Sequence, residues 1–368
     1  MVAAAGSGKT TWIVNQALEQ THGNVLITTY TVENAKEIER KITEINRAMP
    51  EYITVQTWFS FLLQHGVKPY QGKMILDHIR GLILVNEQSV RYIAEEKTKE
   101  HYFTDSQKIY SDKLSKFVIK NNERSSGAVI DRLKRIYTHI YVDEVQDLAG
   151  YDLDVLRMFF ASVSDVLLVG DPRQVTYLTH PAKLYSPYRN GRIKEFVTDK
   201  KLDCEIDEIT LNRSHRNNWA ICAFSSRLYP NFPPSEPCAC EKCRNNTPEH
   251  DGLFLIRPSD VGQYIEIYSP KVLRQQQASE GEWTYGASKG LGFDRVLIYP
   301  TLGILKYLKD GKLTKTKKSE TIDAFDIAKF YVAVTRARYS VGIVCDFKNE
   351  SYIAGLIKWN VIVQTQLF

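Results

Sequence analysis

Two separated segments of the chain carry residue types that bind and cleave a triphosphate. The first is AAAGSGKTT at positions 3–11, and an apolar-periodic stretch follows it, so it predicts a strand end, a glycine loop and a helix start. In such a phosphate-binding loop (P-loop) backbone N–H groups surround a phosphate, the lysine reaches the β and γ oxygens, and the first threonine binds Mg²⁺. The predicted nucleotide-binding residues here are Gly6, Ser7, Gly8, Lys9, Thr10 and Thr11.

The second segment, HIYVDEVQD at positions 139–147, is an apolar strand that ends in two carboxylates. Asp143 is suited to hold Mg²⁺ through water, and Glu144 to polarise the attacking water. Both halves of a nucleoside-triphosphatase site are therefore present. Phosphoryl transfer also needs positive charge near the γ-phosphate, for which Arg216 and Arg336 are candidates. Taken singly, either arginine would more often form a surface salt bridge.

Taken in order, these segments closely resemble the UvrD/Rep/PcrA family of superfamily 1A helicases, from residue 3 to about residue 346. The acidic motif has the family form DExQD, GDPRQVTY at 170–177 is similar to the third motif, and YVAVTRA at 331–337 is similar to the sixth. The segment 283–294 resembles the fifth motif. The resemblance implies catalytic roles for Lys9, Asp143, Glu144, Gln174, Arg216 and Arg336, and nucleotide contacts for Lys289 and Gly290 as well.

The resemblance also implies a track for nucleic acid. The segments 25–31 and 54–61 are similar to DNA-facing segments of the family, and aromatic stacking suits sequence-independent binding because every base offers a π-face. The implied contacts are Thr29, Tyr30, Thr31, Thr57, Trp58, Phe59, Tyr177 and Thr284. For Phe59, packing in the core is an equal alternative.

The chain departs from the family pattern at several positions. Gly286 stands where relatives have histidine, Gly292 where they have a glutamate that helps hold nucleotide, and Phe59 where many have histidine. The glutamine-containing segment that reads adenine is not found before the P-loop. Three explanations stay open: the adenine contact is missing, a partner supplies it, or the biological chain starts further upstream.

The cysteines suggest a second metal. The segment CACEKC at 238–243 and His250 could form a tetrahedral Zn²⁺ site from Cys238, Cys240, Cys243 and His250. A cysteine-rich surface loop is an equal alternative. Cys204, Cys222 and Cys345 are expected to be buried apolar residues, and a reducing cytosol argues against disulfides.

Alternating strands and helices predict an α/β fold with two RecA-like parallel-sheet domains and nucleotide between them. The first domain is expected at 1–203, with a small helical insertion like the family's 1B domain at about 69–135. The second is expected at 204–368, with only a short cysteine-containing insertion at about 230–282 in place of the larger 2B domain.

The composition is that of a folded globular protein. Hydrophobic residues make up 43% and charged residues 25% of 368 residues. The net charge of +5 permits a polyanionic partner without requiring one. Lysines at 306–318 could grip phosphates, but a solvated charge run is the more common role. No apolar run of about 18 residues and no secretory signal occurs, which predicts a cytoplasmic protein without a membrane partner.

The sequence therefore predicts an ATP-dependent helicase or translocase that uses ATP and Mg²⁺ and acts on single-stranded DNA or a tailed duplex. Movement from 3′ to 5′ is implied by the resemblance alone. The alternative is an ATP-gated nucleic-acid sensor or regulatory subunit of a repair or anti-phage complex, which would work with a nuclease or another protein partner.

Overall fold

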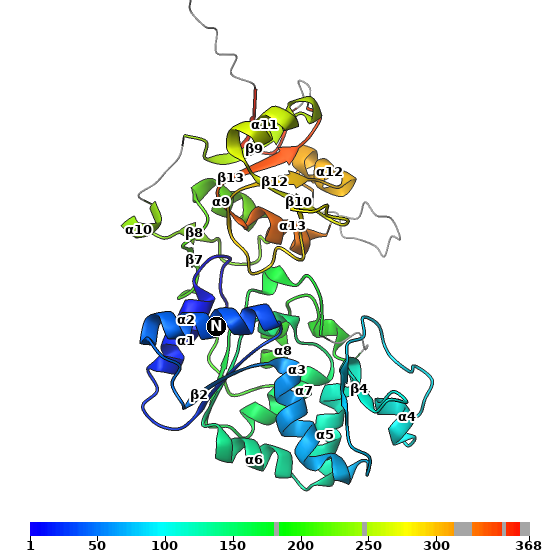
Figure 1. Cartoon of the computed structure of the whole chain (residues 1–368). Coiled ribbons are helices and arrows are strands. Elements are labelled where there is room, and N and C mark those ends of the chain that lie inside the picture. Colours follow the sequence, from blue (N-terminus) through cyan, green and yellow to red (C-terminus); the bar gives the residue numbers. More distant parts are fainter. Residues whose placement is uncertain (180–183, 245–248, 313–325, 348–350, 361–368) are drawn as a thin grey trace, which may run out of the picture. The chain divides into compact units, whose positions relative to one another are not determined.

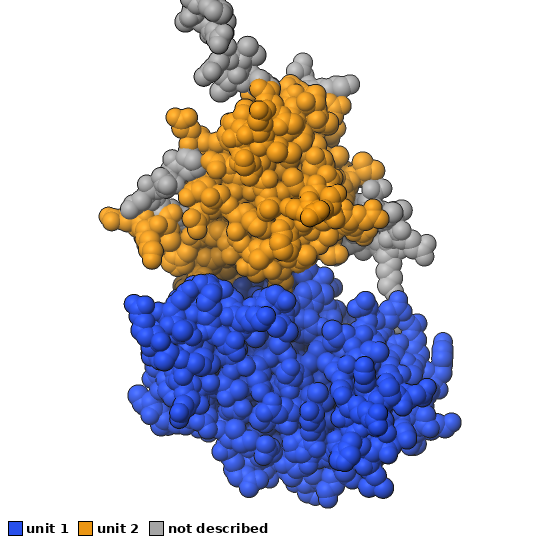
Figure 2. Space-filling view, in the orientation of Figure 1, with its two compact units in different colours: residues 1–2, 9–207 blue, residues 3–8, 208–368 orange. Residues whose placement is uncertain are grey.

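The computed structural model describes residues 1–179, 184–244, 249–312, 326–347 and 351–360. The chain forms two compact units, which Figure 2 shows in blue and orange. Unit 1 contains Met1–Val2 and Lys9–Asp207, and unit 2 contains Ala3–Gly8 and Glu208–Phe368. The glycines of the P-loop thus belong to unit 2, while its lysine begins the first helix of unit 1.

Unit 1 is built on a four-stranded parallel sheet in the order β2-β1-β5-β6, of which Figure 1 labels the edge strand β2. The strands are β1 (Val25–Thr29), β2 (Ile53–Thr57), β5 (His139–Val142) and β6 (Asp165–Leu168). Every residue of β1 and β5 is buried, as expected for parallel strands covered on both faces. Thr29 lies beside Thr57 in the ladder, so the residues that follow the strands emerge at one edge of the sheet.

Amphipathic helices cover this sheet. In α2 (Val32–Asn46) the buried residues Ala35, Ile38 and Ile42 follow helical spacing, and the side chain of Thr31 caps the helix by accepting a hydrogen bond from the N–H of Asn34. The other helices of unit 1 are α1 (Lys9–Leu18), α3 (Trp58–Phe61), α4 (Thr98–Tyr102), α5 (Leu114–Arg124), α6 (Ala128–Ile136), α7 (Tyr151–Phe160) and α8 (Ile193–Asp199).

The segment 69–135 differs from the predicted helical insertion. It contains a short parallel ladder of β3 (Gly81–Ile83) and β4 (Lys108–Tyr110) as well as helices. Its last two helices belong to the main core, because Phe117 of α5 and Leu133 of α6 are buried in the same cluster as Ile140 of the central sheet. Ile79, Tyr102 and Ile109 from earlier in the segment belong to this cluster too, so the segment shares the core of unit 1. Its identity as a 1B-type insertion stays a prediction.

Unit 2 contains a six-stranded parallel sheet in the order β11-β10-β12-β13-β9-β14. Its strands are β9 (Gly252–Ile256), β10 (Lys271–Arg274), β11 (Trp283–Thr284), β12 (Phe293–Tyr299), β13 (Ala337–Val344) and β14 (Leu356–Lys358). Its main helices are α9 (Trp219–Arg227), α11 (Val261–Tyr268), α12 (Leu302–Asp310) and α13 (Ile327–Val334). A separate parallel ladder joins β7 (Arg213–Ser214) to β8 (Glu236–Pro237), and α10 (Glu241–Arg244) follows it.

Two parallel sheets covered by helices confirm the predicted fold class, an α/β protein with two RecA-like domains. Within the described ranges, no helix combines the length and the apolar character needed to cross a membrane. Part of the lysine-rich segment, including Lys315, Lys317 and Lys318, lies outside the described residues.

Candidate nucleotide-binding site

The two carboxylates predicted for catalysis follow the buried strand β5 directly. The N–H of Asp143 donates to the carbonyl of Thr28 on the neighbouring strand at 2.8 Å, which fixes where the strand ends. Glu144 has a φ of 55°, a left-handed conformation that is uncommon outside glycine and costs about 1–3 kcal/mol. Asp143 and Glu144 are only 5% and 8% exposed. The sheet thus holds both carboxylates at its carboxyl edge in a strained, mostly dry setting.

Lys9 and Glu144 are brought together within unit 1. The Lys9 Nζ lies 3.9 Å from Glu144 Oε1, and both side chains are nearly buried. This separation is longer than a hydrogen bond, so the two charges attract each other without a direct contact. Lys9 is also the first residue of α1, whose N-terminal N–H groups favour anions, and Thr10 and Thr11 lie in the same first turn.

A chain of hydrogen bonds fixes the orientation of Glu144. The side-chain nitrogen of Gln146 donates to the carboxylate of Glu144. The side-chain oxygen of Gln146 accepts from the backbone N–H of Asp171 at 3.1 Å. The carboxylate of Asp171 in turn accepts from Arg173 Nε and from Gln174 Nε2, each at 2.7 Å. Gln174, the predicted γ-phosphate sensor, is thereby connected to Glu144 through side chains that are almost fully buried.

Within unit 2, the P-loop glycines pack against the segment 214–216. Gly6 and Gly8 have φ values of 70° and 84°, which favour glycine. A Cβ on Gly6 would lie 2.7 Å from both Arg216 Cβ and Ser214 Oγ, so no side chain fits there. The N–H of His215 donates to the Gly6 carbonyl at 2.8 Å. Ser7 is buried in this loop.

Arg216 lies next to a departure from the family pattern. Its Nη1 donates to the carbonyl of Thr335 at 3.2 Å, and a Cβ on Gly292 would lie 3.1 Å from its Nε. Burial, together with repulsion from Arg338, lowers the pKa of Arg216 to about 10. Glycine at position 292 thus makes room for this guanidinium, which a side chain there would crowd.

Arg336 has well-defined partners in the interior of unit 2. Its Nε donates to the Val332 carbonyl at 3.1 Å, and its Nη1 donates to the Leu291 carbonyl at 3.0 Å. These bonds support the loop that carries Lys289 and Gly290, where Gly290 has a φ of 85°. The role of Arg336 as an arginine finger stays a prediction.

Three aromatic residues predicted to face nucleic acid gather at the carboxyl edge of the unit 1 sheet. The ring of Tyr30 lies 5.4 Å from that of Phe59 and 5.0 Å from that of Tyr177, measured between centroids. Burial and the nearby carboxylates of Asp152 and Asp147 raise the pKa of Tyr30 to about 12. Burial first, and then the charge of Asp147, also raises the pKa of Tyr177 above its usual value. The surroundings of both tyrosines thus favour the neutral phenol over the phenolate.

Trp58 is a correction to the predicted nucleic-acid contacts. It is 1% exposed, and its indole N–H donates to Asp152 Oδ1 at 2.8 Å in the interior of unit 1. Because α3 begins at Trp58, this side chain points into the core, where it packs against Phe61 and Phe159.

The predicted threonine contacts have local structural roles. Thr57 caps α3 by accepting from the N–H of Ser60, as Thr31 does for α2. Thr29 is buried in β1. In unit 2, the hydroxyl of Thr284 accepts from the N–H of Ala287 at 3.2 Å. Their contact with nucleic acid stays a prediction.

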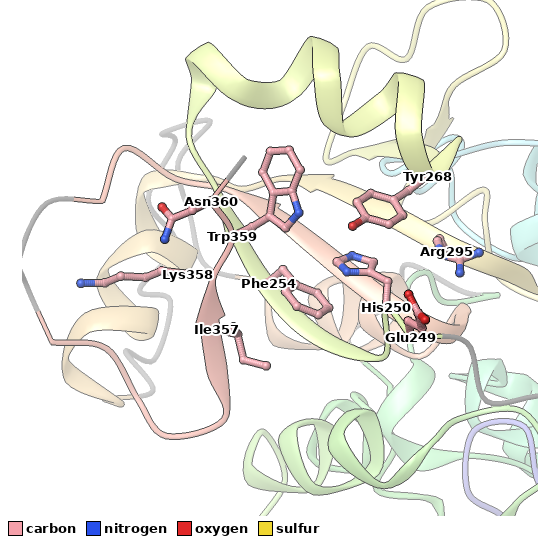
Figure 3. A pocket seen from close by; sticks show the side chains of 9 residues that line it. All are labelled: Glu249, His250, Phe254, Tyr268, Arg295, Ile357, Lys358, Trp359 and Asn360. Carbon is pink, nitrogen blue, oxygen red and sulfur yellow. The ribbon is translucent and has the colours of Figure 1, made fainter. Parts of the chain in front are cut away.

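The fourth partner of the cysteine cluster is His215, not His250 as predicted. The ligand atoms of His215, Cys238, Cys240 and Cys243 all lie within 4.8 Å of one another. His250 instead stacks between Phe254 and Tyr268, with ring centroids 3.8 Å away on each side (Figure 3). Its Nε2 shares a hydrogen bond of 2.9 Å with the hydroxyl of Tyr264. These aromatic partners hold the histidine in the pocket at the sheet, away from the thiols.

The remaining cysteines are divided by burial. Cys222 and Cys345 are buried as predicted, whereas Cys204 is exposed, which corrects its assignment to the core. Cys204 follows α8 in the segment that leaves unit 1, where the chain lies at the surface.

Three residues that matter to the site were missed from sequence. Asp171 orients Gln174, the buried Asp152 accepts the indole of Trp58, and His215 joins the cysteines. Only Asp171 carried a signal, since it lies inside the GDPRQ motif. The partners of Asp152 and His215 are distant in the sequence, so spacing could not reveal them.

Comparisons with known proteins find similarity to one family model and to several solved structures. No curated protein matches the sequence. Similar solved structures include arterivirus nonstructural protein 10 (helicase), at 14% identity and a TM-score of 0.49, covering 95% of this chain and 60% of that one. The same protein in complex with DNA gives the same identity and TM-score and is covered over 61% of its length. The PRRSV helicase gives 13% identity and a TM-score of 0.44, with 95% and 52% covered. The chain thus spans about 60% of the first of these proteins. Residues 1–180 are similar to a family model described as an AAA domain.

Proposed function

We propose that the protein is an ATP-driven motor of the superfamily 1A helicase type, which moves along single-stranded DNA. The observation that carries this proposal is the setting of Glu144. This carboxylate is buried, strained, attracted to the P-loop lysine and oriented by Gln146. Backbone strain clusters at active sites, and a general base for water has to be held in a fixed orientation, so this combination favours a catalytic over a structural carboxylate. The similarity of residues 1–180 to a family model described as an AAA domain supports a nucleotide-dependent function.

The residues fit ATP and Mg²⁺. Gly6 and Gly8 have the positive φ values that let a loop turn its N–H groups toward a phosphate, and Lys9 adds positive charge at a helix N-terminus. Thr10 and Asp143 provide the oxygen ligands that Mg²⁺ prefers. Bound Mg²⁺ would neutralise charge on the β and γ oxygens.

The side chains of the protein would then divide the hydrolytic work. Glu144 orients the attacking water and accepts its proton, and Gln146 keeps the carboxylate in place. Gln174 carries the state of the γ-phosphate to Asp171 and Gln146 through the hydrogen-bond chain. Arg216 stabilises negative charge that develops in the transition state.

Single-stranded DNA is the proposed track. Tyr30, Phe59 and Tyr177 form an aromatic group at the edge of the sheet where Asp143 and Glu144 also emerge. Stacking on such rings is independent of base identity and is made and released at each step of a motor. Movement from 3′ to 5′ follows from the family resemblance, and a nuclease or other protein partner is part of the same proposal.

The first experiment measures ATP hydrolysis by the intact chain with and without single-stranded DNA, beside Lys9→Ala. Lys36→Ala is the matched control, because this lysine is exposed on α2. We expect DNA to stimulate hydrolysis in the intact chain and in the control, and hydrolysis to be lost in Lys9→Ala. Negligible hydrolysis by the intact chain would reject an autonomous motor.

A second experiment separates a motor from a nucleic-acid sensor. Duplexes with a 3′ or a 5′ tail are offered with ATP, and strand displacement is followed. Displacement from the 3′-tailed duplex alone is expected of the motor. DNA affinity that depends on nucleotide, with no displacement or stepping, would instead favour the sensor.

A further inference from the structure

His215 and three cysteines form a compact group of metal-ligating atoms in unit 2. The Nδ1 of His215 lies 3.7 Å from the sulfur of Cys240 and 3.7 Å from that of Cys243. The sulfurs of Cys238 and Cys240 are 3.1 Å apart. Three thiols and one imidazole form a donor set typical of a closed, structural Zn²⁺ site.

These distances are close to those that a tetrahedral ion imposes. With Zn–S near 2.3 Å and Zn–N near 2.0–2.1 Å, adjacent ligands should be about 3.5 Å apart for nitrogen and sulfur and about 3.8 Å for two sulfurs. The two measured distances from His215 Nδ1 to sulfur, 3.7 Å each, agree with the expected value within about 0.2 Å. The distance between Cys238 and Cys240 needs to widen by about 0.7 Å, which rotation of the exposed Cys240 side chain can supply.

The backbone prepares this arrangement. In the parallel ladder of β7 and β8, Ser214 lies beside Pro237, and the N–H of Cys238 donates to the carbonyl of Ser214 at 2.9 Å. The next residues, His215 and Cys238, are therefore neighbours although 22 positions separate them. Cys240 and Cys243 follow at the start of α10, where the N–H of Cys243 donates to the Cys240 carbonyl at 3.1 Å. Four ligands thus come from two segments that only the fold brings together.

The elements that carry the cysteines are short. Strands β7 and β8 have two residues each and α10 has four, too few to bury a core of their own. Metal ligation commonly stabilises small elements of this kind, since the binding free energy becomes folding free energy.

The histidine of the cluster also contacts the P-loop. Its N–H donates to the Gly6 carbonyl at 2.8 Å, and its Cδ2 would lie 3.6 Å from a Cβ on Gly8. The imidazole therefore has one side toward the thiols and another toward the phosphate-binding glycines, and Arg216 is the next residue. Fixing the imidazole on a metal would fix the backbone that supports Gly6.

We propose that His215, Cys238, Cys240 and Cys243 bind one Zn²⁺ ion, and that this ion braces the segment 214–217 against the P-loop so that metal occupancy sets nucleotide affinity. The metal site stands on its own geometry, whereas the effect on nucleotide rests on the function proposed above.

The metal is tested on the purified full-length chain by elemental analysis. We expect about one zinc per chain in the wild type and in Cys204→Ser, which changes an exposed cysteine outside the cluster. Losing a residue that only hydrogen-bonds to a metal ligand lowers metal affinity by roughly 10- to 100-fold. For His215→Ala and Cys240→Ser, which each remove a ligand itself, we expect zinc affinity to fall by at least this factor. Zinc retained by His215→Ala but lost from His250→Ala would overturn the assignment of the ligand.

Two further measurements keep the result clear if a variant folds poorly. Co²⁺ is exchanged into the wild-type chain, where intense visible bands are expected for a tetrahedral thiolate site. In the folded wild type, the cysteines of the cluster should be protected from a thiol reagent, and removal of the metal by a chelator should make them reactive. A disulfide among these cysteines, or weak binding with no tetrahedral spectrum, would overturn the site.

The link to the P-loop is tested with a fluorescent ATP analogue on zinc-loaded, chelated and zinc-restored chains. We expect affinity to fall on chelation and to return with zinc, with Cys204→Ser behaving as wild type. If zinc is stoichiometric but the affinity for the ATP analogue is unchanged by chelation, the brace would be overturned and the metal site would stand. Stoichiometric zinc in a chain that never binds or hydrolyses ATP would contradict the proposed function and the brace that rests on it, and would leave the metal site intact.

Discussion

For single residues, the proposed chemistry depends on how tightly the surrounding structure constrains an otherwise ordinary side chain. Glu144 differs from a surface glutamate by its left-handed backbone, its burial and its hydrogen bond from Gln146. Gly170 contributes to this constraint, because a Cβ there would lie 2.3 Å from the Gln146 oxygen. The carboxylate is thus held by neighbours whose own freedom is small.

Replacing Glu144 by glutamine should remove the base and keep the shape. We expect ATP binding to persist and hydrolysis to fall by about 10²- to 10⁴-fold, the usual contribution of general acid–base catalysis. Steady-state hydrolysis and equilibrium binding of a labelled nucleotide measure the two effects. Glu51→Gln, at an exposed position, is the control. Hydrolysis at the wild-type rate in Glu144→Gln would show that another group acts as the base.

His250 makes the stability of unit 2 depend on pH. Burial between aromatic rings, with Arg295 nearby, lowers the pKa of His250 to about 4, against about 6.5 for an unperturbed histidine. Between these values the unfolded chain binds more protons than the folded one, so stability is complete above about pH 6.5 and falls as the pH drops towards 4. Urea unfolding at several pH values measures this loss.

His250→Phe should keep the stack and remove this part of the pH dependence. His78→Ala, which changes an exposed histidine, should retain the wild-type profile. An unchanged acid loss in His250→Phe would mean that other groups are responsible.

Among the elements, the short helix α3 places two neighbouring aromatic residues in different contacts. Its first residue, Trp58, is anchored in the core by Asp152. Phe59 is buried in the same core cluster, and its ring also contacts that of Tyr30. Successive residues of a helix point in directions about 100° apart, so neighbours in the sequence serve different surroundings.

Trp58→Phe should therefore lower stability, whereas Tyr30→Leu should lower affinity for DNA. Without the indole donor, Asp152 keeps only hydroxyl partners, and we expect unit 1 to lose about 1–3 kcal/mol of stability while affinity for single-stranded DNA is unchanged. Tyr30→Leu keeps bulk but loses the aromatic face, which should weaken DNA binding by about 1–3 kcal/mol. Urea unfolding and fluorescence anisotropy measure the two quantities. A DNA-binding defect in Trp58→Phe at full stability would return Trp58 to the nucleic-acid contacts.

At the scale of the whole molecule, the proposed machinery is divided between the units. Lys9, Asp143 and Glu144 belong to unit 1, while Gly6 and Arg216 belong to unit 2. The chain passes from one unit to the other between Gly8 and Lys9, inside the P-loop itself.

Arg216→Ala tests whether unit 2 takes part in hydrolysis. We expect nucleotide binding to persist and hydrolysis to fall by about 10³-fold or more, as for the loss of an arginine finger. Arg338→Ala is the matched control: it removes the charge that repels Arg216 and should leave hydrolysis near the wild-type rate. Rates are compared at saturating ATP and DNA. Full activity of Arg216→Ala would exclude Arg216 from the transition state.

The sequence by itself determined the features that depend on contiguous residues. The P-loop, the DExQD motif and the alternation of strands and helices are local patterns, and the parallel sheets with buried central strands agree with them. Cys222 and Cys345 were also placed correctly, because apolar neighbours in the sequence predict burial.

The tertiary structure decided what depends on distant partners. Pairing of β7 with β8 brings His215 to the cysteines, and the stack with Phe254 and Tyr268 removes His250 from them. Packing on Asp152 likewise withdraws Trp58 into the core. The physical reason is the same in each case: the direction and neighbours of a side chain are set by contacts between segments far apart in the chain, which local spacing does not encode.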